Sequence, residues 1–567
     1  MSVANIAGQS SSTTTVLTYP DVTVGELPAH MAVLYGDRPA VIDGARTLTY
    51  RQLDQQTQRI ASALAARGVG HGDMVVLYLF NSVDFILAYY GSLRSGASVT
   101  LVNPLQPVAG LRAQIVETAA RIGFTQAEQA PRLVEAGETL EAIIVVDRAA
   151  TAQTDPTDAT IALAEFLEAP AHAGGVGTGA SAGDIAHIAY TGGTTGVSKG
   201  VRVLHRNVIA NVTQMIGWRA GHAVLVDDSA ALRLEPRGDG PGRGVIPGEG
   251  ATIVVSPLFH AHALINMSFL LLCGVTQVLA GRFDPGRMLE LIEKHRATYI
   301  TGSPAMWHAL ATHPDVDTRD TSSVRVMSSG AAPIDPVTLR ASSAGFPTAA
   351  VVEGYGLTEA TCLVCSAPLS EGGEYRLGSV GLPTYDTDIE IREAGETEVS
   401  LPAGERGVLW VRGPQVTDGY LDHPEATAAQ YVDGWLNTGD IAYRDDDGYV
   451  FICDRAKDML IYKGYNVYPR ELEDILVTHP AISAAAVVGR DAGAVGQEPV
   501  AFVVPKADQR IDADEVMAYV AEKVLPYKKI RDVMVIDALP VSTAGKIQKV
   551  RLREQVRGEH RDHTATR

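Results

Sequence analysis

The hydrophobic pattern of this chain alternates between helix-like and strand-like segments from about residue 45 to residue 355. Apolar side chains such as Leu53, Ile60 and Leu64 recur at helical spacing, and short β-branched runs follow such segments. This alternation is typical of parallel strands that lie side by side with helices on both faces of the sheet. The sequence therefore predicts an α/β fold with doubly wound sheets, with strands at 74–79, 98–102, 142–146 and 251–255 and helices at 53–64, 83–93 and from Asp284 onward.

The most apolar long stretch, residues 265–279, contains Asn266, Thr276 and Gln277 and falls short of the ~20 apolar residues that a membrane span needs. We expect a buried helix followed by a strand there, and no integral membrane association. The N-terminus has neither the basic nor the apolar region of a secretory signal, so we expect residues 1–24 to be a disordered tail.

The pattern changes in the last third of the chain. Extended runs separated by Gly- and Pro-containing turns predict a small β-rich lobe over 378–453. Mixed helical and extended patterns follow, so we expect a large domain over 25–456, a small α+β domain over 457–556 and a disordered tail over 557–567. Residues 228–250 are expected to form a long surface loop that is either functional or merely tolerated.

The charge balance narrows the possible partners. The 567 residues include 47 Lys and Arg and 66 Asp and Glu, which gives a net charge of −19. A surface this acidic does not favour nucleic acid or an anionic membrane, so any polyanion must bind in a local site. Four cysteines in a chain of this length form no disulfide framework, and we expect a cytoplasmic location.

The sharpest motif is the run 190–200, Tyr-Thr-Gly-Gly-Thr-Thr-Gly-Val-Ser-Lys-Gly, which follows the apolar strand 185–189. Glycines allow backbone N–H groups to approach an anion, the threonines add hydroxyl donors, and Lys199 adds a positive charge. The run is not a Walker A loop, because Ser198 rather than glycine precedes the lysine and no Ser or Thr follows it. Taken alone, such a loop is either a phosphate cradle or a flexible turn.

This loop resembles the phosphate loop of the adenylate-forming superfamily, which includes acyl-CoA synthetases, aryl-CoA ligases, adenylation domains and firefly luciferase. That family usually has serine where this chain has Gly192 and proline where it has Ser198. Four further motifs occur in the family's order, and the resemblance covers roughly residues 25–555. Each motif alone could be an ordinary turn or a solvated charge, whereas their ordered occurrence indicates the family.

The resemblance implies roles for the nucleotide-binding residues. ATP phosphates would lie on Thr191, Gly192, Gly193, Thr194, Thr195, Gly196 and Lys199. In the motif Gly354-Tyr355-Gly356-Leu357-Thr358-Glu359, the tyrosine would lie against adenine and Thr358 would contact the α-phosphate. Glu359, together with Thr195, would hold Mg²⁺, a cation that prefers oxygen ligands. Asp440 would bind the ribose hydroxyls, and Arg455 would support the ribose or phosphate.

The resemblance also implies that the C-terminal domain is mobile. Lys457 occupies the family's hinge position, and Lys546 resembles the lysine that enters the site only for adenylation. In the second half-reaction Lys546 would leave, and the strand with Gly464 and Asn466 would approach, leaving room for the thiol of CoA.

The segment 257–264 resembles the family's acyl-pocket segment, with His260 at the aromatic gate and His262 directed toward the substrate. For each histidine, a buried structural role is the alternative. The expected lining of the acid and adenine pockets comprises His260, His262, Ser329, Gly330, Ala331, Ala332, Gly356 and Cys362. The pair Cys362 and Cys365 is expected to be buried and apolar rather than a redox or zinc site.

The resemblance is closest to the fatty-acyl and coumarate-type CoA ligases. It implies an enzyme that converts a fatty or aryl carboxylic acid and ATP to an acyl-adenylate and pyrophosphate, and then transfers the acyl group to CoA. One alternative is a stand-alone adenylating enzyme that loads a carrier protein or passes an unusual oxyanion to an amine. Another is a non-catalytic nucleotide-binding protein, which the retention of Glu359, Asp440, Arg455 and Lys546 disfavours.

Overall fold

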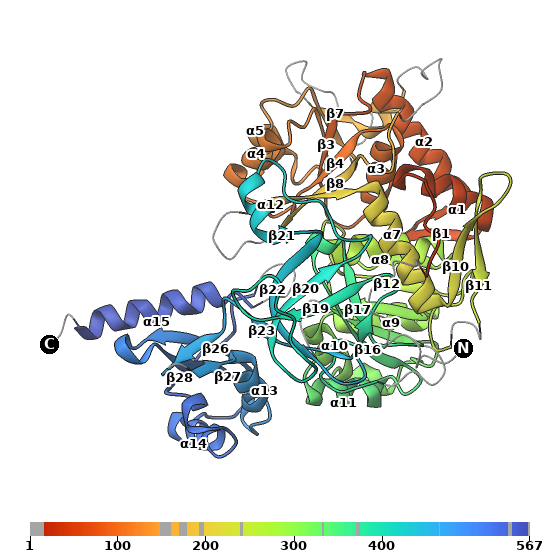
Figure 1. Ribbon diagram of the computed structural model, residues 1–567. Helices are drawn as coiled ribbons and strands as arrows, with labels where there is room; N and C mark the ends of the chain where they lie inside the picture. The colour runs from red at the N-terminus through yellow and green to blue at the C-terminus, as the bar shows by residue number, and fades with distance from the viewer. Residues whose placement is uncertain are drawn as a thin grey trace.

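The computed structural model describes residues 16–147, 160–168, 179–191, 198–238, 242–330, 334–369, 375–463, 465–541 and 547–564. Figure 1 shows a large body made of the N-terminal and central parts of the chain, with the C-terminal domain beside it. The α/β class predicted from the sequence is confirmed, because strands and helices alternate through the body.

The first sheet of the body is almost entirely parallel. Its strands lie in the order β7 (Thr160–Ala162), β6 (Ala142–Val145), β5 (Ile122–Thr125), β3 (Met74–Tyr78), β4 (Ser98–Leu101), β8 (Ile185–Thr191) and β9 (Lys199–Leu204). Only β9 runs antiparallel to its neighbour within this sheet. Strands β5 and β6 are buried at every residue, as expected for strands covered on both faces.

Two further sheets complete the core of the body. One has the order β12 (Ala251–Val254), β13 (Thr276–Leu279), β1 (Pro39–Asp43) and β2 (Arg46–Thr49). The other has the order β14 (Tyr299–Gly302), β15 (Val326–Ser329), β16 (Ala350–Gly356), β17 (Leu363–Ser366) and β18 (Leu382–Pro383). Strands β14 to β16 are parallel, so their carboxyl ends meet at one edge, which carries Ser329 and Gly354.

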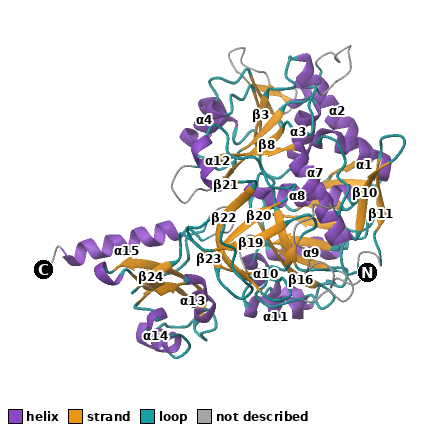
Figure 2. Cartoon of the chain, in the orientation of Figure 1, coloured by secondary structure: helices purple, strands orange, loops and turns teal. Residues whose placement is uncertain are grey.

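Helices cover these sheets, as Figure 2 shows by colour. The expected helix that begins at Asp284 is confirmed as α9 (Pro285–His295), and Asp284 Oδ1 accepts a hydrogen bond from Arg287 N at 2.7 Å. The apolar stretch 265–279 contains the end of the buried helix α8 (Ala261–Leu272) and strand β13, as expected. The remaining helices of the body are α1 (Leu27–Tyr35), α2 (Tyr50–Ala66), α3 (Val83–Arg94), α4 (Val108–Glu117), α5 (Ala130–Ala136), α6 (Leu163–Phe166), α7 (His205–Met215), α10 (Pro304–Ala311) and α11 (Pro336–Gly345).

The expected β-rich lobe is one antiparallel sheet. Its order is β19 (Asp388–Arg392), β20 (Gly407–Arg412), β22 (Trp435–Arg444) and β21 (Tyr431–Val432), with β23 (Val450–Arg455) paired to β22. Helix α12 (Pro424–Gln430) precedes β21 and lies beside the first sheet in Figure 1. The lobe therefore brings Asp440 and Arg455, which are register partners on β22 and β23, to the body.

The C-terminal domain has its own α+β core. Its sheet has the order β26 (Ile482–Asp491), β27 (Gln497–Pro505) and β28 (Asp532–Val535), and a hairpin of β24 (Leu460–Tyr462) and β25 (Tyr465–Val467) precedes it. Its helices are α13 (Pro469–Leu476), α14 (Ala513–Ala521) and α15 (Lys549–Thr564). A separate apolar cluster, centred on Leu472, Val487, Val503 and Val516, packs α13 and α14 against the sheet. Helix α15 packs on the sheet through Leu552 and Val556 in a second cluster.

The expected N-terminal disorder does not extend through residue 24. From residue 16 onward the chain is tied to the lobe: Asp386 accepts hydrogen bonds from the backbone N–H groups of Val16 and Leu17 and from the Tyr19 hydroxyl, at 2.5–3.1 Å. Leu17 is buried. Since the partner lies some 370 residues away along the chain, no local pattern signals this contact. Residues 1–15 lie outside the described residues.

Two other expectations were wrong in part. Residues 228–250 do not form one long loop, because β11 (Leu232–Pro236) pairs with β10 (His222–Val226) in an antiparallel hairpin, and Val245 is buried. The apolar run 223–226 supplies the partner strand for that hairpin. Helix α15 continues to Thr564, past the point where the C-terminal tail was expected to begin, and its first turns are fixed by the buried side chains of Leu552 and Val556.

Among the described residues, no helix combines the length and the apolarity that crossing a membrane would require.

Candidate active site

The glycine–threonine loop is anchored at both ends. Thr191 ends β8 and pairs with Lys199 at the start of β9, and the Ser198 hydroxyl donates to the Thr191 carbonyl at 2.6 Å. The two ends of the loop are therefore held together where β8 ends and β9 begins. The predicted phosphate contacts Gly192, Gly193, Thr194, Thr195 and Gly196 lie outside the described residues.

Lys199 and Glu359 meet through a tyrosine that the sequence analysis missed. Lys199 Nζ lies 5.1 Å from the centroid of the Tyr420 ring, and the Tyr420 hydroxyl donates to Glu359 Oε1 at 2.9 Å. Strand β9 holds this tyrosine in place, because Leu421 N donates to the Gly200 carbonyl at 2.8 Å. Burial and the neighbouring Glu359 raise the pKa of Tyr420, so its hydroxyl remains a donor. The loop lysine and the expected metal ligand are thus brought together.

Glu359 lies in a short 3₁₀ turn, Thr358–Ala360, directly after β16. Its carbonyl accepts hydrogen bonds from Thr417 N at 3.0 Å and from the Thr417 hydroxyl at 2.9 Å. The backbone is packed closely here, because a Cβ on Gly356 would lie 1.5 Å from the Cys362 carbonyl oxygen, and only glycine fits. Thr358 and Glu359 are half-buried, so both side chains are held while remaining partly open to solvent.

Tyr355 and Asp440 form the second contact of this region. The Tyr355 hydroxyl donates to Asp440 Oδ2 at 2.5 Å, and Arg455 Nε lies 3.7 Å from Asp440 Oδ1. Burial and the adjacent carboxylate raise the pKa of Tyr355. Gly439, at φ +70°, turns the chain just before Asp440. The Gly439 carbonyl accepts a hydrogen bond from Ala456 N at 2.9 Å. Tyr355, expected to lie against adenine, and Asp440, expected to bind the ribose, therefore contact each other.

The expected hinge residue follows directly on β23. Desolvation and the nearby Arg455 lower the pKa of Lys457, whereas Asp458 and Asp440 act in the opposite direction. Lys457 therefore interacts electrostatically with Asp440. On its other side, Asp458 forms an ion pair with Arg553 of α15.

Of the other expected C-terminal residues, Asn466 alone lies in the described part of the chain. Lys546 and Gly464 lie outside the described residues. Asn466 is exposed on β25, opposite Ile461 of β24. Its neighbour Tyr465 stacks on Tyr527 of the same domain, with ring centroids 4.6 Å apart.

The expected acid pocket draws residues from α8 and from the carboxyl ends of β15 and β16. His260 caps the start of α8, and its ring lies 4.4 Å from that of Phe259. A Cβ on Gly330 would lie 3.0 Å from His262 Nε2, so the missing side chain makes room for that ring. Ser329 is buried, and its hydroxyl has no hydrogen-bond partner among the described residues. The expected residues Ala331 and Ala332 lie outside the described residues.

The two cysteines beside this pocket are buried and unpaired, as expected. Burial raises the pKa of Cys362 to about 12 and also raises that of Cys365. Within the described part of the chain, no three His, Cys, Asp or Glu side chains gather in a way that could hold a metal ion.

Two buried charged residues at this edge were missed by the sequence analysis. Glu353, immediately before Gly354, is 3% exposed, and its Oε1 accepts from Ile334 N at 2.9 Å. Burial raises the pKa of Glu353 to about 7. Arg219 is 2% exposed and lies in the π-helical segment Ile216–Ala220 that ends α7. Neither belongs to a recognised motif; the only sequence signal was a charged residue inside a segment of otherwise apolar pattern.

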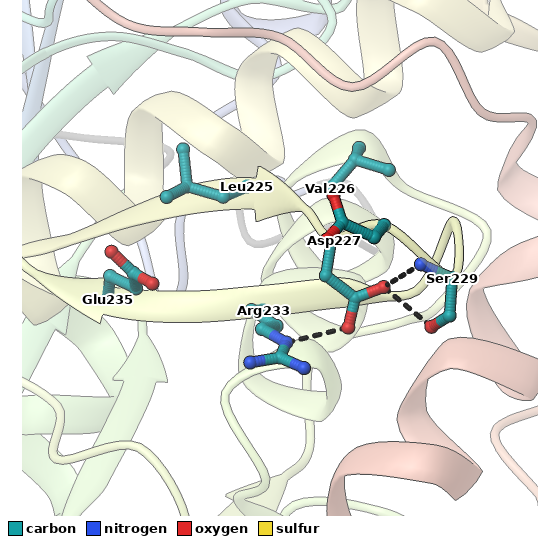
Figure 3. A pocket seen from close by; sticks show the side chains of 7 residues that line it. Leu225, Val226, Asp227, Ser229, Arg233 and Glu235 are labelled. Carbon is teal, nitrogen blue, oxygen red and sulfur yellow. Dashed lines mark hydrogen bonds and ion pairs between the residues drawn. The ribbon is translucent and has the colours of Figure 1, made fainter.

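A separate depression lies on the β10–β11 hairpin, as Figure 3 shows, lined by Asp227, Ser229 and Arg233 among others. Asp227 Oδ2 accepts from Arg233 Nε at 2.6 Å, and Oδ1 accepts from the Ser229 hydroxyl at 2.6 Å. These hydrogen bonds satisfy the carboxylate within the hairpin itself. The depression shares no residue with the site built around Glu359 and Asp440.

Family models and curated relatives place the chain in the same family. A sequence model described as "AMP-binding enzyme" matches residues 29–421, and one described as "AMP-binding enzyme C-terminal domain" matches residues 471–546. A curated relative, 4-coumarate–CoA ligase 5 of Oryza sativa subsp. japonica, is 34% identical over 552 residues, which cover 95% of this chain and 96% of that protein.

Solved structures share this fold over most of the chain. The amide bond synthetase McbA from Marinactinospora thermotolerans has a TM-score of 0.80 at 25% identity, covering 94% of this chain and 99% of that one. A benzoate CoA ligase from Burkholderia xenovorans LB400 has a TM-score of 0.78 at 25% identity, covering 94% and 100%. From the family match and the site geometry together, the chain belongs to the AMP-binding enzyme family.

Proposed function

We propose that this protein is an AMP-forming acid–CoA ligase that acts on a carboxylic acid of the aryl or fatty class. In the first step a carboxylate oxygen attacks the α-phosphorus of ATP, and the bond to pyrophosphate breaks. In the second step the CoA sulfur attacks the acyl carbon, its proton is lost, and the bond to AMP breaks. The observation that carries the proposal is the match over nearly the whole chain to a curated CoA ligase.

The geometry supports a nucleotide on the side of the site that contains Lys199, Tyr355, Glu359 and Asp440. Asp440 is held between Tyr355 and Arg455, so its carboxylate is oriented to accept hydrogen bonds from the ribose hydroxyls. Lys199 and the backbone of the preceding loop supply positive potential for the phosphates within an otherwise acidic chain. We assign the first-step electrostatic role at the α-phosphate to Thr358 and Lys546.

The donor set fits Mg²⁺, which we propose as the cation that accompanies ATP. Glu359 offers carboxylate oxygen, the ligand type that Mg²⁺ prefers, and Mg²⁺ commonly takes only one or two protein carboxylates besides phosphate oxygens. Glu359 keeps one oxygen on Tyr420, which fixes the orientation of the carboxylate. Thr195 would add a hydroxyl. When bound, the cation would neutralise charge on the phosphates.

The proposed acid side contains His260, His262, Ser329, Gly330 and Cys362. Small residues at 329 and 330 leave space beside the His262 ring, and the buried Ser329 hydroxyl has no hydrogen-bond partner among the described residues. Several curated relatives are 4-coumarate–CoA ligases, which supports an acid of aromatic type.

For the location we propose the cytoplasm, because all four cysteines are free, as a reducing compartment favours. The C-terminal domain would supply Lys546 for adenylation. It would then present the strand with Gly464 and Asn466 to CoA after rotation at Lys457.

The test is a panel of aryl, fatty and dicarboxylic acids incubated with the full chain, ATP and Mg²⁺, with mass spectrometry of the products before and after CoA is added. We expect an acyl-adenylate first and an acyl-CoA afterwards. Lys546→Ala should lower adenylation on the order of 10²–10³-fold. Lys506→Ala, a lysine on the surface of the same domain, is the matched control.

Different products would give different answers. Product only with an amine or a carrier protein would overturn the CoA assignment. Absence of adenylate with every acid in the panel would overturn the ligase itself.

A further inference from the structure

Arg219 is a buried cation with only neutral partners. Its Nη1 donates to the hydroxyl of Tyr299 and to Asn266 Oδ1 at 3.4 Å, and its Nη2 donates to the Ser366 hydroxyl at 3.4 Å. Its Nε is buried and has no hydrogen-bond partner among the described residues. In the described part of the chain, the groups that accept from the guanidinium are an amide, a phenol and a hydroxyl, and none is a carboxylate.

Such an arrangement is unfavourable unless something compensates for it. An isolated charge that leaves water loses several kcal/mol of solvation, and weak hydrogen bonds to neutral groups return only part of that. The Tyr299 ring lies 5.9 Å from the guanidinium carbon, near the outer limit of a cation–π contact. The end of a helix adds only a fraction of a charge. Within the described protein, the guanidinium therefore lacks an anion.

The side chain lies at the proposed acid pocket. A Cβ on Gly354 would be 3.2 Å from Arg219 Nη2, and Gly354 pairs with Ser366 across β16 and β17. Asn266, which Nη1 contacts, is one helical turn beyond His262, and its Nδ2 donates to the His262 carbonyl at 2.7 Å. Arg219 therefore contacts Asn266, and Asn266 contacts His262, whose ring lies beside Gly330.

The Nε side of the guanidinium is the side that lacks a partner. Nη1 donates to Tyr299 and Asn266 and Nη2 donates to Ser366, whereas the buried Nε has no hydrogen-bond partner among the described residues. Nε–H and the outer Nη2–H point in parallel, so together they can donate to the two oxygens of one carboxylate.

We propose that Arg219 binds a second carboxylate of the substrate, distant from the reacting one, so that the protein activates dicarboxylic acids. This inference rests on the proposed ligase function and narrows its substrate class. The reacting carboxylate attacks ATP as before, and the second one gives up no atom and forms no covalent bond. Ser366, Asn266 and Tyr299 position the guanidinium.

The test compares acids that differ only at the far end. Terephthalate is compared with p-toluate and with its monoamide, and straight-chain diacids are compared with monoacids of equal length. Acid-dependent pyrophosphate release gives kcat/KM for each. The wild-type protein should prefer at least one diacid over its matched monoacid by about tenfold or more, the scale for losing one partner of a buried charge pair.

Variants then assign the preference to Arg219. Arg219→Leu should abolish or invert it, mainly through KM for the diacid, while adenylation of the monoacids persists. Arg219→Lys should keep only part of it, because an ammonium lacks the planar fork. Arg233→Leu, an exposed arginine on β11, is the matched control and should leave the preference unchanged.

Two results would overturn the inference while leaving the ligase function standing. One is equal or better use of every monoacid by the wild-type protein. The other is a diacid preference that Arg219→Leu does not alter. The wild-type protein alone shows whether diacids are preferred, even if the leucine variant folds poorly. In that case Arg219→Lys shows whether the preference depends on Arg219. Pyrophosphate release with no acid at all would instead reject the proposed function.

Discussion

The two sides of the candidate active site differ in how their charged groups are partnered. On the proposed ATP side, Asp440 is held by Tyr355 and Arg455, and Glu359 by Tyr420, so each carboxylate has a fixed orientation. On the proposed acid side, the groups that Arg219 contacts among the described residues are all neutral. The carboxylates on the ATP side are thus oriented before ATP binds. On the acid side, by our proposal, the ligand itself supplies the anion that pairs with Arg219.

The largest effect should come from Glu359 on the ATP side. Glu359→Gln keeps the shape and the contact with Tyr420 but removes the negative charge proposed to hold Mg²⁺. We expect adenylation to fall on the order of 10²–10³-fold, as for loss of one transition-state electrostatic group. Acid-dependent pyrophosphate release measures it. Glu396→Gln, at an exposed turn, is the control, and a loss below about threefold would remove Glu359 from the proposed cation site.

The next effect concerns stability and Glu353, which lies between the two sides. Burial raises its pKa from 4.5 to about 7, so the folded protein binds a proton that the unfolded chain releases. Stability contributed by this proton is present below about pH 4.5 and is lost as the pH rises through about 7. Glu353→Gln should therefore stabilise the protein increasingly with pH, by roughly 3 kcal/mol above the folded pKa.

Thermal or chemical unfolding of both proteins at a series of pH values measures this difference. A constant difference would mean that a cation neutralises Glu353 in solution. Arg470, whose charge lowers the pKa of Glu353, would be a candidate for that cation.

A smaller effect is expected for Tyr355→Phe. This variant removes the hydroxyl that donates to Asp440 at 2.5 Å but keeps the ring. Loss of a hydrogen bond to a charged group costs about 1.5–3 kcal/mol, so KM for ATP should rise roughly ten- to hundredfold while KM for the acid stays constant. Steady-state kinetics with each substrate varied in turn measures the split. An equal rise in both KM values would show that Tyr355 supports the whole site rather than the ATP side.

The smallest effect should come from Tyr420→Phe. Glu359 keeps its charge and loses one orienting donor, so a few-fold loss of activity is expected, with a weaker apparent affinity for Mg²⁺. Titration of activity with MgCl₂ tests this. No change in the Mg²⁺ dependence would contradict the orienting role of the tyrosine.

Much of the framework was predictable because it depends on local patterns. Strand β3 and helix α3 follow from apolar runs of the right period, and the start of α9 follows from Asp284 and Pro285. The order of motifs also indicated Glu359 and Asp440. Both of these residues do meet the tyrosines of their own region in the structure.

What escaped prediction depends on contacts between distant segments. Asp386 ties down residues 16–19 from far along the chain, and Tyr420 reaches Glu359 because its segment pairs with β9. Arg219 could not be found because a lone arginine after a helical pattern normally lies in solvent. Its burial results from the packing of α7 and α8 together with the strand edge that carries Gly354.

The most direct test of the proposed adenylation is the exchange of labelled pyrophosphate into ATP, measured without CoA. This exchange requires reversible adenylation and nothing else. We predict Mg²⁺-dependent exchange that appears only when an acid is added and is faster with a dicarboxylic acid than with its matched monoacid. ATP binding without exchange, for every acid in the panel, would contradict the account.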